Sequence, residues 1–422
     1  MVKVILQLYP MLRAESEAER EALRPIGRNS DRFQEFVRDL PALAKKADEL
    51  GVYAITSVEH HFHSEGYEVG PAPTVLAALL AGITKNVRVG ALGYTMSANN
   101  PIRIAEETAL IDQYSQGRSV VGFSRGYQAR WTDILGQHYG AGATQSPDGF
   151  SQSQIDARSD EQLKAEFDKD RRNRDVFEEN VQIVVDAWTK DTITADGINW
   201  KVPYPITGIA TPMKDVTSRL GAPGEIGDDG LQQAISVVPS TVQKPHPPVF
   251  IASNTSKATV EYAATRGFRP THFSKITQAA SFAEAYVDEA KKVGLDVAYG
   301  EKQALVRWIQ IAETNEKARE QVMKYDEEIY RNLYWPLTPK MPLDKDDPVT
   351  AMVNGGLFNV GTLEEVKAEF IAQWKQLPAE YCVLIYHFPH MPGDLVAEQL
   401  ELFMTEIKPE LDKLTAAYEN DD

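Results

Sequence analysis

Three histidines stand within four residues of one another in the stretch SVEHHFHSEGYEVG, which runs from residue 57 to residue 70. They are His60, His61 and His63, and Glu59 precedes them directly. Histidine is the side chain whose ordinary pKa lies near neutrality, so it exchanges protons at physiological pH and also binds metals. The stretch could therefore be an acid/base site, a metal site or a polar turn.

A metal site would need more ligands than the histidine stretch provides. His61 and His63 alternate in an extended segment, which places two imidazoles on one face, as a metal site in a barrel hydrolase requires. Most later strand ends carry Ser, Arg, Asn or Thr, although His272 and His387 are exceptions. We expect no metal, while these two histidines keep that alternative open.

A second candidate site is one for an anion. Arg125 ends a predicted strand, and "SNTSKATVEYAA" opens a predicted helix. The free N–H groups and partial positive charge of a helix N-terminus suit a phosphate, and the hydroxyls of Ser256 and Thr259 could add hydrogen bonds. An ordinary helix cap by Thr255 or Ser256 would explain the same residues, so the spacing leaves both interpretations open.

These candidates follow strands in a chain where strand-like and helix-like segments alternate. The predicted strands are residues 2–9, 52–59, 87–95, 119–126, 248–253, 270–274, 304–313 and 381–388. The predicted helices are residues 33–51, 72–85, 101–115, 174–190, 256–267, 281–294, 315–333, 362–377 and 394–414. Eight strands, most followed by a helix, indicate an α/β fold of the (β/α)8 TIM-barrel type, with a doubly wound open sheet as the alternative. In such barrels the chemistry lies at the carboxyl ends of the strands.

Long polar segments interrupt the alternation near residues 140–172, 203–247 and 336–354. We interpret them as insertions, after strands four and seven, into a single barrel domain of residues 1–422. A hairpin is predicted over residues 193–202 with Asp196 and Gly197 at its turn, and a short strand over residues 234–239.

Composition excludes several classes of partner. The 44 basic and 61 acidic residues give a formal charge of −17, which disfavours nucleic-acid binding. No apolar run reaches the roughly 20 residues that span a bilayer, and the N-terminus is too short and strand-like for a signal peptide. We therefore expect a cytoplasmic protein without a membrane partner. Cys382 is the one cysteine, so no intrachain disulfide forms, and its apolar neighbours predict a buried thiol.

The order of motifs along the chain resembles that of a known family. The family pattern is E-H-H-F after strand two, then P-[IV]-R-x-A-E-E, L-D-Q-x-S-x-G-R and G-x-[CS]-R-G. Residues 59–62, 101–107, 111–118 and 122–126 correspond to it, and "PPVFIASNTSKATVEYAATRG", "NVGTLEEVKAEF" and "FMTEIKPEL" continue the similarity. Over most of its length the chain thus resembles the bacterial luciferase family of flavin-dependent monooxygenases.

The resemblance implies a barrel that binds FMN at the strand ends. Reduced FMN (FMNH2) would come from a separate NAD(P)H:flavin reductase and would be used with dioxygen to oxygenate a small organic substrate. The implied protein is the oxygenating part of a two-component enzyme and a homodimer. A deazaflavin-dependent oxidoreductase and a non-catalytic flavin-binding barrel are the alternatives on the same fold.

The resemblance also assigns roles to individual residues. His60 matches the acid/base residue near flavin and substrate, and His61 matches a structural or orienting group. Leu92 and Gly93 match the position of a non-prolyl cis peptide bond under the flavin ring. Ser124 stands where the luciferases themselves carry a reactive cysteine near the flavin, so thiol chemistry is not needed here.

Arg125, Ser256 and Thr259 match the phosphate-contacting positions of the family. A dianionic phosphate beside an arginine and helix N–H groups is a charge-assisted arrangement. The resemblance and the helix-terminus reasoning therefore select the same three residues.

The insertions limit what the resemblance can say about substrate. The segments near 140–172 and 203–247 are expected to shape the substrate pocket, so the substrate of luciferase is not carried over. Residues 336–354 match a region that forms a mobile lid in the family, with a plain surface connection as the alternative. Tyr94, Tyr127 and His387 are predicted near the pocket from their strand-end positions alone.

Overall fold

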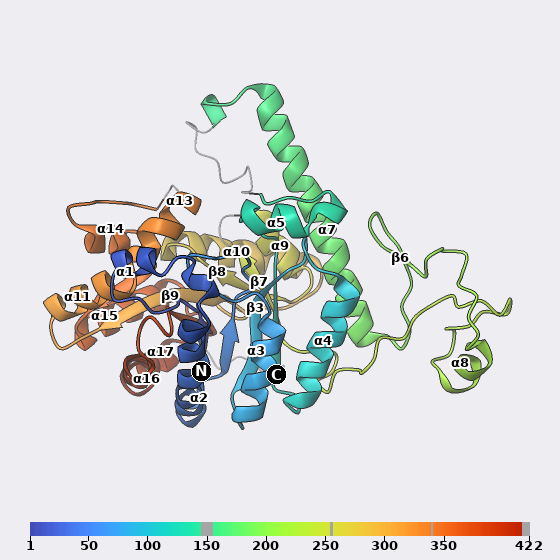
Figure 1. Ribbon diagram of the computed structural model, residues 1–422, viewed down its shortest axis with the longest axis horizontal. Helices are drawn as coiled ribbons and strands as arrows, with labels where there is room; N and C mark the ends of the chain where they lie inside the picture. The colour runs from blue at the N-terminus through green and yellow to red at the C-terminus, as the bar shows by residue number, and fades with distance from the viewer. Residues whose placement is uncertain (145–154, 254–255, 339–340, 416–422) are drawn as a thin grey trace. The chain divides into compact units, whose positions relative to one another are not determined.

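The computed structural model describes residues 1–144, 155–253, 256–338 and 341–415 (Figure 1). Thr255, and parts of the segments predicted as insertions near 140–172 and 336–354, lie outside these residues. The chain divides into two compact units, Met1–Gly93 with Pro248–Asp422, and Tyr94–Pro247. No helix in the described part of the chain is long and apolar enough to cross a membrane.

The first unit is built on a parallel sheet. From one side to the other its strands pair in the order β7, β8, β9, β11, β1, β2 and β3. Their bounds are β1 Lys3–Leu8, β2 Ala54–Ser57, β3 Arg88–Thr95, β7 Val249–Ser253, β8 Arg269–His272, β9 Ala304–Ile311 and β11 Tyr381–Tyr386. Every residue of β9 and β11 is buried, as expected for parallel strands that are covered on both faces.

An eighth barrel strand, β4 (Ser119–Ser124), belongs to the second unit. The prediction of a (β/α)8 TIM barrel is confirmed. One short strand was not predicted: β10 (Phe358–Gly361) pairs with the second half of β9, where β8 has already ended. Four residues with a glycine at the end give too weak a pattern to be recognised as a strand.

Most helices of the first unit follow the predicted positions with shifted ends, but α1 and η1 were not predicted, and the helix predicted over residues 394–414 is divided into α16, η5 and α17. Asn29 begins α2 by accepting a hydrogen bond from the Arg32 N–H, and Thr362 and Glu365 form a capping box on α15. The bounds are α1 Glu17–Ala22, η1 Ile26–Arg28, α2 Ser30–Glu49, α3 Pro73–Ile83, α9 Lys257–Ala264, α10 Ile276–Lys292, α15 Leu363–Gln376, α16 Gly393–Leu402, η5 Phe403–Ile407 and α17 Lys408–Leu414.

The helix predicted over residues 315–333 is broken in the structure. It consists of α11 (Asn315–Tyr325), α12 (Glu327–Ile329) and a π-helical turn η4 (Tyr330–Tyr334), followed by α13 (Trp335–Leu337). A further helix, α14 (Pro348–Asn354), lies inside the segment predicted as a loop over 336–354. π-Helical turns are frequent at functional sites, so residues 330–334 are a candidate part of one.

The second unit is mainly helical. Its elements are α4 Pro101–Tyr114, α5 Ala129–Leu135, η2 Gln137–Tyr139, α7 Asp160–Thr189, β5 Ala195–Asp196, β6 Lys201–Val202 and α8 Lys214–Leu220, and α7 is the long green helix of Figure 1. The antiparallel pairing of β5 with β6 confirms the predicted hairpin. Residues 234–239 are not a strand, because Ile235 makes only an isolated bridge to Ile193.

The largest error in the second unit concerns α7. The helix was predicted to begin at Arg174, but it begins at Asp160. Ser159 and Gln162 form a capping box there, which stabilises a helix start among residues too polar to show an apolar stripe. The single-domain organisation and the bounds of the three insertions stay predictions.

Candidate active site

The loop after β2 turns sharply and so brings His60 and Glu68 together. Phe62 and Glu68 have positive φ angles of 63° and 46°, which few non-glycine residues adopt. The His60 N–H donates to the carbonyl of Gly70 over 3.1 Å and forms an isolated antiparallel bridge. The chain therefore doubles back on itself directly after the strand end.

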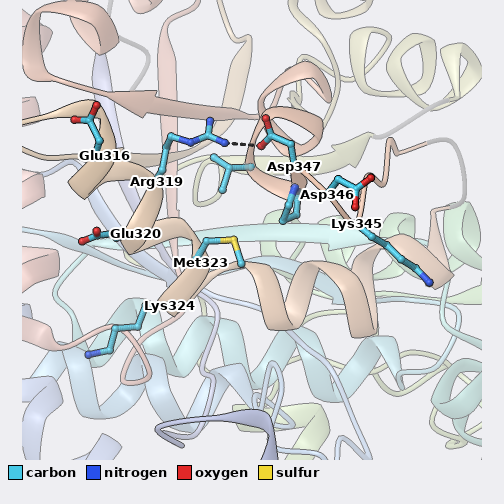
Figure 2. A pocket seen from close by; sticks show the side chains of 10 residues that line it. Glu316, Arg319, Glu320, Met323, Lys324, Lys345, Asp346 and Asp347 are labelled. Atoms are coloured by element: carbon cyan, nitrogen blue, oxygen red, sulfur yellow. Dashed lines mark hydrogen bonds and ion pairs between the residues drawn. The ribbon is translucent and has the colours of Figure 1, made fainter.

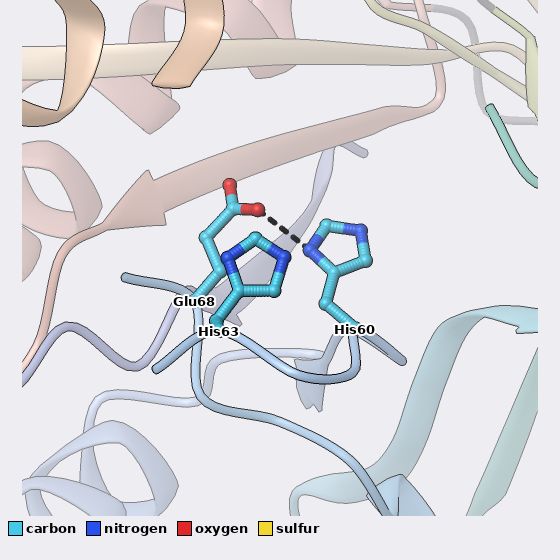
Figure 3. A group of neighbouring side chains, drawn as sticks. All are labelled: His60, His63 and Glu68. Carbon is cyan, nitrogen blue, oxygen red and sulfur yellow. Dashed lines mark ion pairs between the residues drawn. The ribbon is translucent and has the colours of Figure 1, made fainter. Parts of the chain in front are cut away.

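His60 forms an ion pair with a buried carboxylate. Its Nδ1 lies 2.6 Å from Oε2 of Glu68, and the rings of His60 and His63 stack with centroids 5.8 Å apart (Figure 3). Burial favours the neutral form of Glu68, but the nearby charges of His60 and His63 outweigh it, so the pKa of Glu68 is lowered. The carboxylate is therefore held ionised beside the histidines.

His61 has a different carboxylate. Its Nε2 lies 3.1 Å from Oε1 of Glu59, and both side chains are largely buried. The two adjacent histidines therefore face separate partners, and the predicted orienting role of His61 stays a prediction. The neighbouring Phe62 is 52% exposed and takes no part in either pair.

His387 was predicted only as a pocket residue, and the structure gives it two polar partners. Its Nδ1 lies 2.7 Å from Oδ1 of Asp326, and its Nε2 lies 2.7 Å from the hydroxyl oxygen of Tyr334. Asp326 stands between α11 and α12, and Tyr334 ends η4. The sequence analysis missed both residues, because it predicted one continuous helix through this segment.

Aromatic rings connect these groups across the strand ends of the first unit. Trp308 on β9 lies near Tyr9, Tyr334 and His387, with centroid separations of 6.1, 5.8 and 6.4 Å. Tyr9 in turn meets the ring of His60 edge-on at 6.2 Å. Within this unit, the ends of β1, β2, β9 and β11 thus converge as the barrel predicts.

The metal alternative can be judged from the same geometry. Among the described residues, His60, His63 and Glu68 place three ligand-type atoms within 4.8 Å of one another. Two ligands of one zinc ion stand about 3 Å or more apart, because each bond is about 2.0–2.2 Å long. His60 Nδ1 and Glu68 Oε2 are closer than that, at 2.6 Å, and form an ion pair. We therefore interpret these two side chains as an ion pair, and the metal alternative stays open for the group.

In the second unit, Arg125 is held by residues of α7. Its Nε donates to Oδ1 of Asn173 over 3.0 Å, and its Nη2 pairs with the carboxylate of Asp170. The Asn173 amide returns a hydrogen bond to the Arg125 carbonyl over 2.9 Å. Burial is the main reason that the pKa of Arg125 is lowered from its usual range. The sequence analysis missed both partners, which lie in or beside the segment predicted as an insertion.

The remaining predicted residues are divided between the units. Ser124 and Thr95, both in the second unit, have hydroxyl oxygens 3.0 Å apart. In the first unit, Ser256 precedes α9 and Thr259 lies in its first turn, and both are buried. Ser256 is the N-cap residue of α9, but its side chain makes no capping hydrogen bond.

Leu92 and Gly93 lie near the end of β3 in the first unit, and Leu92 is buried. All cis peptide bonds of the described residues precede proline, so the expected cis bond between Leu92 and Gly93 is not observed. The single cysteine, Cys382, is fully buried, as predicted, and burial raises the pKa of its thiol.

Two surface cavities lie away from the predicted residues. One, of about 720 Å³, is lined by α11 and residues 345–349, and the Arg319–Asp347 ion pair of 2.5 Å lies at its edge (Figure 2). The other, of about 560 Å³, lies in the second unit beside Tyr139 and Trp200. Neither contains a residue that was predicted to bind the cofactor.

Comparison with known proteins decides the family. The model of the luciferase-like monooxygenase family matches residues 22–380, which is most of the chain. The chain belongs to the luciferase-like monooxygenase family. The predicted family is confirmed.

Individual relatives of this luciferase-like chain match it less completely. The alkanal monooxygenase beta chain of Vibrio harveyi is 38% identical over 97 residues, 23% of this chain and 28% of that one. The alignments therefore cover less than a third of the length of such curated relatives.

Solved structures show the fold over nearly the whole length. The FMN complex of the oxygenating constituent of 3,6-diketocamphane monooxygenase, a type II Baeyer-Villiger enzyme from Pseudomonas putida, has a TM-score of 0.67 at 16% identity, covering 97% of this chain and 98% of that one. An F420-dependent secondary alcohol dehydrogenase has a TM-score of 0.58 at 13% identity, covering 97% and 99%.

Proposed function

We propose that this luciferase-like protein is the oxygenating component of a two-component, FMN-dependent monooxygenase. It would take reduced FMN from an NAD(P)H:flavin reductase and oxygenate a small organic substrate with dioxygen. Membership of a monooxygenase family and the likeness to an FMN-bound oxygenating constituent support this assignment. The expected homodimer and cytoplasmic location belong to the same proposal.

The observation that carries the proposal is the His60–Glu68 pair. The family motif leads to His60, and the structure gives this residue a buried, ionised carboxylate 2.6 Å from Nδ1. A histidine whose ring is fixed by a carboxylate can give or take a proton at its other nitrogen. We assign His60 as the acid/base residue, and Glu59 and His61 as groups that hold the adjacent backbone.

The residues available for the cofactor fit a phosphorylated flavin. Ser256 presents a buried hydroxyl that is not used as a helix cap, at the start of a helix whose N–H groups favour an anion. Thr259 and Arg125 would add a hydroxyl and a positive charge, while Leu92, Gly93 and Ser124 would contact the ring system. When bound, the reduced flavin supplies the electrons that activate dioxygen.

The protein's own task is to bind the flavin and the substrate, to orient them, and to exclude water. The aromatic side chains of Tyr9, Trp308 and Tyr334 surround the His60 region with apolar surface. Exclusion of bulk water strengthens the interactions of a proton donor with its target and limits side reactions. Asp170 and Asn173 hold the Arg125 guanidinium in one orientation.

A deazaflavin-dependent oxidoreductase is the second candidate, because F420-dependent enzymes share the fold. A non-catalytic flavin-binding barrel is the third. The E-H-H-F and S-R-G motifs resemble those of the FMN-dependent members of the family and therefore favour the first candidate. Measurements of cofactor binding and of substrate turnover distinguish the three candidate functions.

The experiment is a binding and turnover panel. The purified chain is titrated with FMN, reduced FMN and F420, and oxygenation of a substrate panel is followed with a flavin reductase. We expect preference for reduced FMN and dioxygen-dependent turnover. His60→Ala should keep reduced-FMN affinity within about threefold but lose about 10²-fold or more in turnover, the usual contribution of a proton donor.

His138→Ala is the matched control, since His138 is an exposed histidine outside the candidate site. It should leave both quantities unchanged. Preference for F420 with hydride transfer would replace the proposal by the second candidate. Flavin binding without any turnover would support the third, and full activity of His60→Ala would remove His60 from the chemistry.

A further inference from the structure

Three side chains that can bind a metal ion meet in the loop after β2. One ligand-type atom each from His60, His63 and Glu68 lies within 4.8 Å of the other two (Figure 3). Glu68 is fully buried, His63 is 5% exposed, and the His60 side chain is 11% exposed. We call these three residues the His-His-Glu group. Its members are close enough, and buried enough, to act on one small ion together.

The carboxylate of Glu68 is the member whose surroundings favour a cation. Among the residues that the structure describes, neither of its two buried oxygens accepts a hydrogen bond of ordinary geometry. The contact of its Oε2 with Nδ1 of His60 is an ion pair by distance alone. A buried carboxylate without hydrogen bonds is costly, and such groups in proteins are paired with a cation or coordinate a metal.

The ligand types and the ring spacing fit an ion of the zinc type. Two imidazoles and one carboxylate are the protein ligands of zinc sites that keep a fourth position open. Two rings bound to one tetrahedral zinc through bonds of about 2.0–2.1 Å have centroids roughly 5–6 Å apart. The ring centroids of His60 and His63 are 5.8 Å apart. The two rings therefore need little movement to share an ion.

One distance in the group must change when an ion binds. His60 Nδ1 and Glu68 Oε2 are 2.6 Å apart, whereas two ligands of one zinc ion stand about 3 Å or more apart. The ion pair requires a proton on the imidazole, and a metal requires that the ligands give up their protons. A metal ion thus replaces the proton between the two side chains and separates their atoms by about half an ångström.

We propose that His60, His63 and Glu68 form a binding site for a divalent ion of the zinc type, and that the bound ion inhibits the protein by occupying His60. A neutral imidazole has one lone pair, which takes either a proton or a metal. The inhibition rests on the acid/base role proposed for His60, whereas the site itself does not.

The third ligand explains why the sequence did not indicate this site. Further ligands were expected at later strand ends, but Glu68 comes from the same loop as the histidines. The turn with positive φ at Phe62 and Glu68 brings this carboxylate back to His60. The site is therefore local in the chain and lies wholly within the first unit.

The direct test is a metal titration that needs neither flavin nor turnover. The full chain is freed of metal with a chelator and titrated with Zn²⁺ by calorimetry, and with Co²⁺, whose visible spectrum reports its ligands. We expect one site per chain. Glu68→Gln and His63→Gln should each weaken zinc binding by more than the ~10–100-fold that loss of an outer-shell partner costs, and each should change the cobalt spectrum.

Matched controls separate this site from general effects of substitution. Glu65→Gln makes the same change three residues earlier in the same loop, outside the group. His138→Ala removes an exposed histidine. Both variants should bind zinc as the wild type does. Absence of stoichiometric zinc in the wild type, or equal zinc affinity in the wild type, Glu68→Gln and His63→Gln, would overturn the site.

Turnover of the reconstituted enzyme tests the inhibition. Zinc should inhibit the wild type at the concentrations that fill the site, and a chelator should restore the rate. In His63→Gln the inhibiting concentration should rise in proportion to the zinc dissociation constant. Flavin reduction by the reductase alone, at the same zinc concentrations, shows whether the partner is the inhibited component.

Two outcomes distinguish the inhibition from the proposed function. Full turnover of the wild type with its zinc site filled would overturn the inhibition and show that His60 is not needed as a proton carrier. If the wild type turns over no substrate even without metal, the proposed function fails, whereas the titrations still decide whether the His-His-Glu group binds a metal ion.

Discussion

Two neighbouring groups of buried side chains hold the broken helix, and they differ in chemistry. One ties it to the end of β11 and consists of Asp326, His387 and Tyr334, which we call the histidine group. The other ties it to the loop after β2, where the Tyr67 hydroxyl donates to Oε1 of Glu328 over 2.8 Å. Arg20 on α1 pairs with the same Glu328 oxygen over 2.5 Å, and Asn332 donates to the Tyr67 hydroxyl over 3.2 Å. We call Arg20, Glu328, Tyr67 and Asn332 the arginine cluster.

The difference between the two groups lies in where a proton can move. The arginine cluster contains a guanidinium that stays charged in proteins, so its protonation pattern has one state near neutral pH. The histidine group contains an imidazole, whose hydrogens can be distributed in more than one way. Both groups anchor the same segment, so the comparison separates an anchor built on a fixed charge from one built on the hydrogen bonds of an imidazole.

The largest expected effect is the loss of the arginine cluster's positive charge. Arg20→Ala would leave Glu328 buried without its ion-pair partner, and removal of one member of a buried pair costs about 3–5 kcal/mol of unfolding free energy. Urea unfolding of the full chain measures it. Arg319→Ala is the control, because Arg319 and its partner Asp347 are both nearly half exposed and such surface pairs contribute about 0–1 kcal/mol. Equal losses in the two variants would show that the cluster is no anchor.

A smaller effect concerns acid pH and His390, which the charges of Arg20, in the arginine cluster, and His387, in the histidine group, both influence. Burial, followed by the charge of Arg20, lowers the pKa of His390 to about 3. Between pH 6.5 and pH 3 the unfolded chain therefore binds the proton that the folded chain refuses, so stability falls as the pH falls. His390 should account for about 3 kcal/mol of that loss between pH 7 and pH 4.

The measurement compares unfolding free energies of the wild type and His390→Gln at pH 7 and pH 4. The variant removes the titrating ring, and its amide can still donate to the Lys324 carbonyl that His390 contacts at 3.0 Å. We expect its loss on acidification to be smaller by about 3 kcal/mol. Curves that remain parallel would mean that His390 is accessible to protons in the folded chain. His272, whose pKa burial lowers to about 4, adds acid sensitivity to both proteins equally.

The sequence predicted the part of the site that is local in the chain. The barrel followed from the alternation of strands and helices, and His60 from its motif at a strand end. Glu68 stood in the same stretch but could not be assigned, because the sharp turn with positive φ at Phe62 and Glu68 has no sequence pattern. The larger obstacle to predicting the site was the separation of partner residues along the sequence.

Contacts between distant segments could not be read from the sequence. Asp326 and Tyr334 lie 61 and 53 residues from His387, and nothing in the helical pattern of residues 315–333 marks the break that aims them inward. Likewise, Asp170 was predicted in an insertion, and only the early start of α7 places it beside Arg125. Packing between elements, rather than local propensity, selects these partners.

The smallest expected effect is also the sharpest comparison between the two groups. Tyr67→Phe and Tyr334→Phe each delete one buried hydroxyl, which contacts Glu328 in the first case and His387 in the second. Loss of a hydrogen bond to a charged group costs about 1.5–3 kcal/mol, less whatever the remaining donors recover, so we expect about 1 kcal/mol for Tyr67→Phe, where Arg20 still pairs with Glu328. Tyr334→Phe should cost about 0.5–1.5 kcal/mol, the usual net contribution of one intramolecular hydrogen bond. Unfolding curves measured side by side on both variants test this, and a loss above about 3 kcal/mol in either variant would mean that its hydroxyl holds the broken helix by more than one hydrogen bond.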